Sequence, residues 1–183
     1  MKKFELTSEF ITNIFGKKLF RVKALVEFGS VKAGELGGYI EKEENLSHNG
    51  NAWVSGDAEV SGDAWVSGDA EVSGNAWVSG NAWVYGNAKV SGDAWVSGDA
   101  KVSGDAEVYD DADYATIKGF GTEFRATTFF RCRDGVVRVR CGCFYGDLGQ
   151  FRSQVKDTRK GKIAEEYLMI ADLMEKHFKE GRL

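Results

Sequence analysis

The hexad Gly50-Asn-Ala-Trp-Val-Ser55 opens an array of ten consecutive six-residue repeats that ends at Tyr109. Each repeat has the form Gly-[Asp/Asn]-Ala-x-Val-[Ser/Tyr], and neither the alanine nor the valine is ever replaced. Because the alanine and the valine are two positions apart, their side chains lie on one side of a strand, and residue x points to the other side. Short strands joined by glycine-containing turns at this period are typical of a parallel β-helix.

The Asp/Asn position of the repeats indicates how many hexads make one coil. Read at intervals of 18 residues, this position alternates between Asp and Asn at all seven vertical steps. The columns are Asn51, Asp69, Asn87 and Asp105; Asp57, Asn75 and Asp93; and Asp63, Asn81 and Asp99. Stacked strands lie about 4.8 Å apart, where two carboxylates repel each other but an Asp and an Asn can share a hydrogen bond. The alternation therefore predicts coils of 18 residues, each made of three hexads.

Tryptophan occurs repeatedly at the outward position x of the hexads. In an 18-residue coil Trp77 stacks on Trp95. Trp65 stacks on Trp83, which in turn meets Lys101. Exposed aromatic side chains often mark interaction surfaces, so Trp65, Trp77, Trp83 and Trp95 are the predicted partner-binding residues. Alternatively, the N-terminal segment, the C-terminal helices or a second copy of the chain covers them, and the last case predicts a homo-oligomer.

The segments on either side of the repeats predict caps for the two ends of the β-helix. A solenoid needs caps because its terminal strands expose unpaired backbone groups. The predicted domains are an N-terminal cap (1–49), the β-helix (50–115) and a C-terminal α+β domain (116–183). In the C-terminal domain we expect a hairpin within 123–144 and helices over about 148–157 and 163–179.

The C-terminal hairpin carries several arginines that suggest a site for an anion. Its Arg133-Asp-Gly-Val136 segment is typical of a two-residue type I′ turn, which places Arg131 opposite Arg138 and Phe129 opposite Arg140. Two facing arginines repel each other in an empty hairpin, and a bound anion would relieve the repulsion. The predicted ligand-binding residues are Arg131, Arg133, Arg138 and Arg140. Alternatively, the acidic coils of the same molecule supply the counter-charge.

Charge is distributed unevenly along the chain. Residues 50–115 carry 2 basic and 12 acidic side chains, a net charge of −10. Residues 116–183 carry 14 basic and 9 acidic side chains, a net charge of +5. The acidic repeat disfavours direct binding to DNA and gives the β-helix a surface that can imitate phosphate. Alternatively, the acids only keep the solenoid soluble.

The composition also disfavours several classes of protein. No stretch approaches the roughly 18 apolar residues of a membrane span, and Glu5 and Glu9 lie where a signal peptide needs apolar residues, so we expect a cytoplasmic protein. The cysteines are an odd number, which argues against a disulfide scaffold. Cys132, Cys141 and Cys143 have a Cys-Gly-Cys spacing and no evident fourth ligand, so neither a metal nor another cofactor is expected.

The whole chain resembles a group of hexapeptide-repeat proteins encoded by phages and prophages of bacteria. The matching features are Gly34–Ser47, the Gly-Asp-Ala and Gly-Asn-Ala array, Thr127–Arg131 and Cys141–Leu148. The resemblance implies a mainly β fold, in which a left-handed parallel β-helix of about three to four coils lies between the N-terminal cap and the C-terminal hairpin and helices. It also implies a phage accessory protein that acts in the host cytoplasm.

The function predicted on these grounds is that of a non-enzymatic binding protein that counters host antiviral defence. In one mechanism the arginines sequester a small anionic signal, such as a nucleotide. In the other, the acidic coils act as a phosphate mimic and mask a host defence protein. The third alternative is an acyltransferase, because hexapeptide-repeat proteins include such enzymes. Only His48 and His177 could supply its histidine general base, and the hexads contain no inserted loop to cover an acyl donor.

Overall fold

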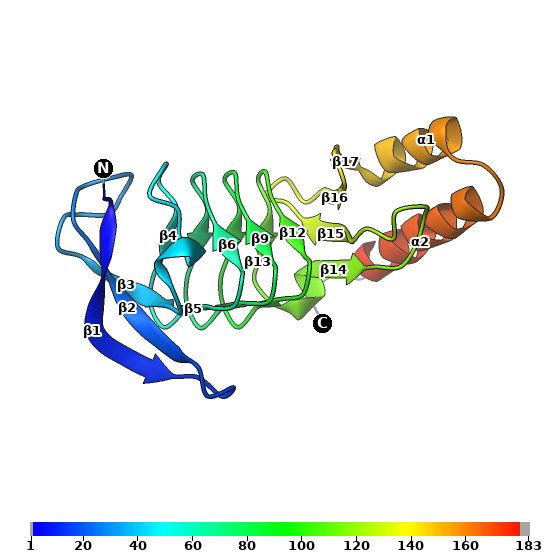
Figure 1. Cartoon of the computed structure of the whole chain (residues 1–183). Helices are drawn as coiled ribbons and strands as arrows, with labels where there is room; N and C mark the ends of the chain where they lie inside the picture. Colours follow the sequence, from blue (N-terminus) through cyan, green and yellow to red (C-terminus); the bar gives the residue numbers. More distant parts are fainter. Residues whose placement is uncertain (1, 180–183) are drawn as a thin grey trace.

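The chain is elongated, with a β-sheet cap at one end, a β-helix in the middle, and a second sheet with two helices at the other end (Figure 1). This computed structural model describes residues 2–179. The N-terminal cap and the C-terminal helices lie at opposite ends of the solenoid. The two flanking segments can therefore each close one end of the stack of coils.

The β-helix consists of ten two-residue strands, one from each hexad. These are β4 (Trp53–Val54), β5 (Glu59–Val60), β6 (Trp65–Val66), β7 (Glu71–Val72), β8 (Trp77–Val78), β9 (Trp83–Val84), β10 (Lys89–Val90), β11 (Trp95–Val96), β12 (Lys101–Val102) and β13 (Glu107–Val108). They form three parallel stacks, β4-β7-β10-β13, β5-β8-β11 and β6-β9-β12. Paired residues are 18 apart, as in Trp77 with Trp95 and Lys89 with Glu107. The predicted 18-residue coil is confirmed.

The interior of the β-helix is made of the invariant alanines and valines. All ten alanines and all ten valines of the hexads are at most 1% exposed. The glycines allow the coils to turn and to stack closely. Gly50, for example, has a φ of +73°, and a Cβ at this position would lie 2.3 Å from the carbonyl oxygen of Gly68. Glycine is therefore required both by the backbone conformation and by the neighbouring coil.

The Asp/Asn columns are linked by side-chain hydrogen bonds between coils. Nδ2 of Asn51 donates to Oδ1 of Asp69 at 2.8 Å. The same bond joins Asn75 to Asp93, Asn81 to Asp99, and Asn87 to Asp105, at 2.9, 3.0 and 3.1 Å. These are the four steps at which an Asn precedes an Asp by one coil. The hydrogen bond that the alternation predicts is confirmed at these steps.

The N-terminal cap continues one side of the β-helix as an antiparallel sheet. Its strands are β1 (Phe4–Thr12), β2 (Lys18–Ala24) and β3 (Leu36–Ile40). β1 pairs with β2 and β2 with β3, and β3 then runs parallel to β5. The combined sheet has the order β1-β2-β3-β5-β8-β11. The cap thus extends the backbone pairing of the first coil on one of its three sides.

Buried side chains close other parts of the first coil. Lys3 is 4% exposed, and its Nζ donates to the carbonyl oxygens of Ala52 at 2.8 Å and Gly50 at 3.2 Å. Asn45, the last residue of the 3-10 helix η1 (Glu43–Asn45), donates to two further backbone oxygens at 2.8 and 3.0 Å. Because no coil lies below these carbonyls, the side chains replace the missing backbone donors. Burial lowers the pKa of Lys3 to about 8.

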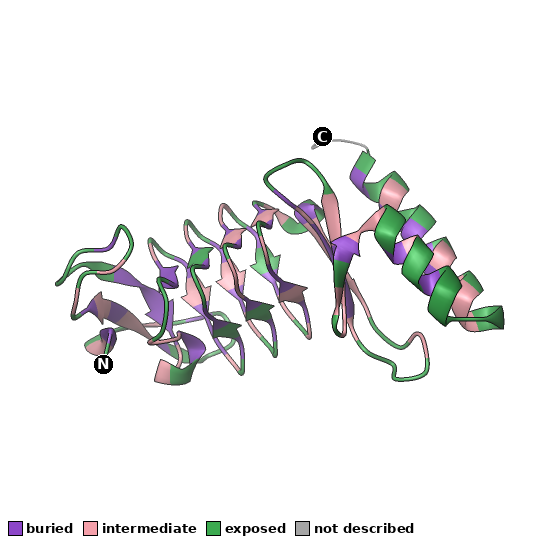
Figure 2. Cartoon of the chain, turned by 90° about the horizontal axis from the view of Figure 1, so that it is seen from above, coloured by how far each residue is buried: buried purple, intermediate pink, exposed green. Residues whose placement is uncertain are grey.

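The C-terminal domain closes the last coil with a sheet. After the last hexad the chain forms the 3-10 helix η2 (Asp111–Asp113), the strands β14 (Tyr114–Ile117), β15 (Thr127–Arg131), β16 (Val137–Cys141) and β17 (Phe144–Asp147), and the helices α1 (Leu148–Thr158) and α2 (Gly161–Lys179). The antiparallel sheet stands between the last coil and the helices (Figure 2). Phe129 and Val139 pack on the helix side, whereas Phe130 and Cys132 join the core of the β-helix. The sheet therefore contributes to two cores.

The two predicted C-terminal helices are confirmed as α1 and α2. Helix α1 begins with a capping box, in which Oδ1 of Asp147 accepts from the backbone N–H of Gln150 at 2.8 Å. Tyr167, Ile170 and Met174 of α2 are buried against this domain. Among residues 2–179, no helix is both long enough and apolar enough to cross a membrane.

The strand pairing predicted for the C-terminal hairpin is wrong by one residue. The pairs that form are Arg131–Val137, Phe130–Arg138 and Phe129–Val139. The connection is a three-residue loop that ends at Gly135, which has a φ of +77°, in place of the expected two-residue turn. Because the loop holds one more residue, the second strand is displaced by one position. Its side chains consequently lie on the opposite face from the one predicted.

The assignment of inward and outward positions can be tested with two substitutions in the repeat. Val78 is 1% exposed, so Val78→Asp should lower the free energy of unfolding by several kcal/mol. Lys89 faces outward and pairs with Glu71 at 3.0 Å, so Lys89→Asp should cost about 1 kcal/mol. Denaturant unfolding of both variants measures the difference. An equal decrease in the free energy of unfolding of the two variants would contradict the assignment of Val78 as inward and Lys89 as outward.

The buried ammonium of Lys3 should make stability depend on pH in the alkaline range. Its pKa is about 8 in the folded chain and 10.5 in the ordinary case, so between these values the unfolded chain binds more protons. The free energy of unfolding should therefore rise with pH, by about 2 kcal/mol between about pH 7 and about pH 10, relative to the same change in Lys3→Met. Urea unfolding measures both free energies. If they change with pH by the same amount in the two proteins, burial of the charge has no such effect.

Candidate functional site

The four arginines predicted to bind an anion do not converge on one site. Arg131 lies on the sheet face that packs against the helices, whereas Arg138 and Arg140 lie on the face toward the β-helix. Arg133 belongs to the loop between β15 and β16. The pair of facing arginines that suggested the site is therefore not formed. Each of the four contacts acceptors of its own chain.

Arg131 connects the end of the β-helix to helix α2. Its Nε lies 3.1 Å from Oδ1 of the fully buried Asp113, and its Nη2 donates to the carbonyl oxygen of Phe178 at 2.9 Å. Oδ2 of Asp113 accepts from the backbone N–H groups of Tyr109 at 3.0 Å and Asp110 at 3.3 Å. A buried carboxylate is stable only with such partners. The arrangement assigns Arg131 a structural role.

Arg133 and Arg138 both have acidic partners. Arg133 pairs with Glu107 of the last hexad at 3.0 Å, and Arg138 pairs with Asp134 of the hairpin loop at 2.7 Å. For Arg133 the counter-charge therefore comes from the acidic coils, as in the alternative prediction.

Arg140 holds the C-terminal sheet against the β-helix through aromatic rings. Its guanidinium lies 5.5 Å from the ring centre of Tyr85 and 5.6 Å from that of Tyr145. Its Nε donates to Oη of Tyr85 at 2.7 Å. Cation–π contacts of this kind stabilise a partly desolvated arginine without an acid. Arg140 is thus part of the joint between the two domains.

The two predicted tryptophan columns are confirmed. The ring centres of Trp65 and Trp83 are 5.5 Å apart and those of Trp77 and Trp95 are 5.6 Å apart, both in edge-to-face geometry. Nζ of Lys101 lies 4.8 Å from the ring centre of Trp83, also as expected. Trp65, Trp83 and Trp95 are 38, 41 and 40% exposed. These large apolar surfaces lie outside the core.

An aromatic ring of the N-terminal cap packs on the column of Trp77 and Trp95. Phe15, at the tip of the hairpin formed by β1 and β2, lies 5.9 Å from Trp77 and 6.2 Å from Trp95 between ring centres. Trp77 is half-buried in consequence, but Phe15 and its neighbour Ile14 remain 58 and 76% exposed. The hairpin therefore covers this column in part and enlarges the apolar surface around it.

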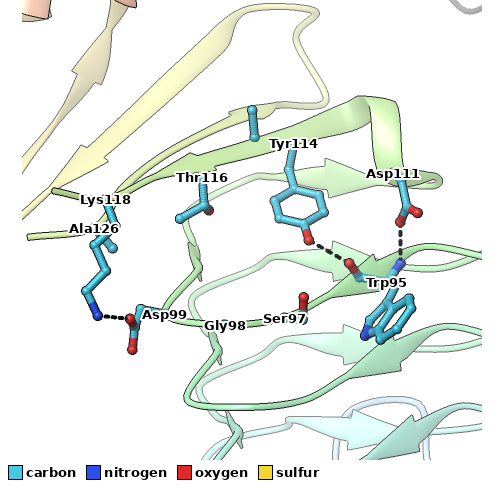
Figure 3. A pocket seen from close by; sticks show the side chains of 10 residues that line it. Trp95, Ser97, Gly98, Asp99, Asp111, Tyr114, Thr116, Lys118 and Ala126 are labelled. Carbon is cyan, nitrogen blue, oxygen red and sulfur yellow. Dashed lines mark hydrogen bonds and ion pairs between the residues drawn. The ribbon is translucent and has the colours of Figure 1, made fainter.

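A groove of about 540 Å³ opens beside Trp95, where the β-helix meets β14 (Figure 3). We call it the Trp95 groove. Tyr114 donates from Oη to the carbonyl oxygen of Trp95 at 2.6 Å, and the backbone N–H of Trp95 donates to Oδ1 of Asp111 at 2.8 Å. These side chains occupy the place of a further strand on β11. Lys118 pairs with Asp99 at the other rim.

Carboxylates flank the same side of the β-helix. Asp57 and Asp93 are exposed in the turns that precede β5 and β11. Asp93 accepts a hydrogen bond from Asn75, and within residues 2–179 neither aspartate forms an ion pair. Burial raises the pKa of Glu59, although a hydrogen bond with Trp77 acts in the opposite sense. This side of the molecule therefore combines aromatic rings with negative charge.

His48 is not arranged as a free general base. Its Nδ1 accepts from the backbone N–H of Lys3 at 3.1 Å, and its Nε2 lies 2.7 Å from Oε1 of Glu43. The ring also stacks on Phe4 at 4.3 Å. Because both ring nitrogens have partners in the cap, the geometry gives the acyltransferase alternative no support at this residue. Within residues 2–179, no cluster of His, Cys, Asp or Glu side chains is suited to hold a metal ion.

Comparison with known proteins supports the β-solenoid repeat and gives no information about the candidate site. Residues 70–86 match the family model described as the YdcK β-solenoid repeat. This segment spans β7, β8 and β9, about one coil, so the similarity concerns the β-solenoid architecture. A search of the curated proteins finds no match to the chain.

Sequence reasoning missed the residues that build the Trp95 groove. Asp111 and Tyr114 lie beyond the regular hexads, and Phe15, which packs beside the groove on Trp95, belongs to no repeated pattern. The sequence does contain a usable clue. Asp111 and Tyr114 follow Trp95 by 16 and 19 residues, which brackets the 18-residue coil and places them above that strand. Residues just after a repeat array are thus candidates for capping its last edge.

The structural role of Arg131 can be tested against that of Arg133. Arg131→Met removes the guanidinium that lies 3.1 Å from the buried carboxylate of Asp113, so the free energy of unfolding should fall by about 3 kcal/mol. Arg133→Met removes a largely exposed ion pair with Glu107 and should cost less than about 1 kcal/mol. Urea unfolding of the two variants measures both values. Comparable stability of the two variants would contradict this role of Arg131.

Proposed function

We propose that the chain is a non-enzymatic binding protein whose partner is a protein that docks on one side of the β-helix. This docking side consists of Phe15, Trp77, Trp95 and the Trp95 groove. The observation that carries the proposal is a partly exposed aromatic column that leads into a groove of about 540 Å³. Aromatic side chains beside a pocket are the groups that dominate binding energy at protein interfaces.

The chemistry of the docking side favours a partner with an apolar anchor and a basic rim. The rings of Trp95 and Tyr114 can contact an apolar side chain placed in the groove. Asp57 and Asp93 provide negative charge on the same side. A solenoid whose coils are fixed by backbone pairing loses little conformational freedom on binding, which favours affinity. These features support the mechanism in which the acidic coils imitate phosphate and mask a host protein.

The geometry gives less support to sequestration of a small anionic signal by the arginines. Arg131, Arg133 and Arg138 are paired with acids of the same chain, and Arg140 is enclosed by two tyrosines. An anion would have to displace these internal contacts. We therefore assign Arg131, Arg133 and Arg140 to contacts that join the C-terminal sheet to its neighbours, Arg138 to its own hairpin, and the binding function to the docking side.

The biological setting of the proposal follows from the resemblance of the chain ends to phage and prophage proteins. Gly34–Ser47 forms β3, η1 and their surroundings, and Thr127–Arg131 forms β15, so the matching segments belong to the two caps. On this basis we propose that the protein acts in the cytoplasm of a bacterial host. Its partner would be a host protein of antiviral defence that normally binds a phosphate-bearing ligand.

The docking side can be tested by comparing its tryptophans with those of the other column. Immobilised protein should retain a specific protein from a lysate of the bacterial host, and raised salt should weaken the retention because exposed charges are screened. Trp77→Ala with Trp95→Ala should reduce the affinity at least about tenfold, since interface tryptophans often contribute 2 kcal/mol or more. The matched control is Trp65→Ala with Trp83→Ala, which should bind as the unchanged protein does.

Two results would contradict the proposal. The first is equal retention, or equal loss, of the captured protein by the two double variants. The second is a decrease in molecular mass in solution caused by Trp77→Ala with Trp95→Ala, which would assign the docking side to a contact between copies of the chain. Light scattering measures the mass, and calorimetry with the purified partner measures the affinity.

A further inference from the structure

A second cavity lies within the C-terminal domain and shares no residue with the Trp95 groove. It has a volume of about 150 Å³. Its walls come from the loop 120–125, the turn that joins β16 to β17, helix α1, and Tyr167 of helix α2. We call it the C-terminal cavity. Neither the β-helix nor the docking side contributes to it.

Aromatic rings form the interior of the C-terminal cavity. The ring centre of Phe151 lies 5.5 Å from that of Phe144 and 5.9 Å from that of Tyr167. Oη of Tyr167 donates to the carbonyl oxygen of Phe120 at 3.2 Å, so the loop is attached to α2. The loop approaches Tyr167 closely at Gly121, because a Cβ at this position would lie 2.5 Å from Oη of Tyr167. The cavity therefore has a fixed, apolar wall suited to a flat ring.

Two guanidinium groups line the same cavity. Arg125 lies over the β16–β17 turn, where a Cβ on Gly142 would be 3.2 Å from its Nη1, and it pairs loosely with Glu123 at 3.5 Å. Arg159 follows the last residue of helix α1, and its Nη1 lies 3.4 Å from the carbonyl oxygen of Thr158. Within residues 2–179, Arg159 has no acidic side chain at ion-pair distance. Its charge also acts on Tyr167 in the interior, where it opposes the rise in pKa that burial causes.

We infer that the C-terminal cavity binds a small aromatic carboxylate. A volume of about 150 Å³ is large enough for a benzene-sized molecule, so one ring fits against the aromatic wall formed by Phe144, Phe151 and Tyr167. The carboxylate then meets the guanidinium of Arg159, which can form two parallel hydrogen bonds with it. The net charge of +5 over residues 116–183 favours the approach of an anion. This site is independent of the proposed protein partner.

The inference is tested by titrating the isotopically labelled full chain with benzoate and with benzyl alcohol, followed by nuclear magnetic resonance. Benzoate should shift the ring resonances of Phe144 and Phe151, with a dissociation constant of about 1 mM or lower. Benzyl alcohol, which has the ring without the charge, should bind at least about tenfold more weakly. Arg159→Gln should reduce benzoate affinity about tenfold and leave benzyl alcohol unchanged.

The matched control is Lys160→Gln, which removes the same charge from the neighbouring exposed residue outside the cavity. It should bind benzoate as the unchanged protein does. Equal affinity for benzoate and benzyl alcohol would overturn the inference, as would equal losses in Arg159→Gln and Lys160→Gln. Benzoate that shifts neither Phe144 nor Phe151 would also overturn it. None of these outcomes depends on whether a partner protein binds the docking side.

Discussion

The structure depends on the backbone hydrogen bonds that join residues one coil apart. The N–H of Trp77 donates to the carbonyl oxygen of Ala94, and the same spacing recurs on all three sides of the β-helix. Because this ladder keeps every coil at the same length, equivalent positions stack in columns. Alanine and valine fill the narrow interior, glycine occupies the turns, and tryptophans and charged residues are repeated on the outside.

The same ladder leaves unpaired backbone groups at both ends, and side chains satisfy many of them. Lys3 and Asn45 donate to carbonyls of the first coil. At the other end, Thr128 accepts from the backbone of Lys101, while Asp111 and Tyr114 bind the backbone of β11. A side chain satisfies a strand edge without covering it as a further strand would. The Trp95 groove lies at the edge of β11, where side chains rather than a further strand satisfy the backbone.

The distribution of charge serves the joint between domains as well as the surface. Arg131, Arg133 and Lys118 of the basic C-terminal domain pair with Asp113, Glu107 and Asp99 of the acidic segment 50–115. These ion pairs neutralise part of the opposite charges of the two segments within the chain. Exposed carboxylates remain on the turns beside the docking side. The same acidic repeat therefore supplies the ion pairs within the chain and, on another side, the negative charge that we propose attracts a basic partner.

The sequence by itself determined the coil, the core and the stacking of the tryptophans, because a strict six-residue period leaves one way to bury the alanines and valines. The helices α1 and α2 were equally predictable from their apolar spacing. The tertiary structure alone decided the face on which Arg138 and Arg140 lie, because one additional residue in the loop before Val136 reverses it. It also decided that Phe15 packs on Trp77 and that Asp111 and Tyr114 border a groove. These contacts join segments that share no period, so their geometry is set by how the caps meet the coils.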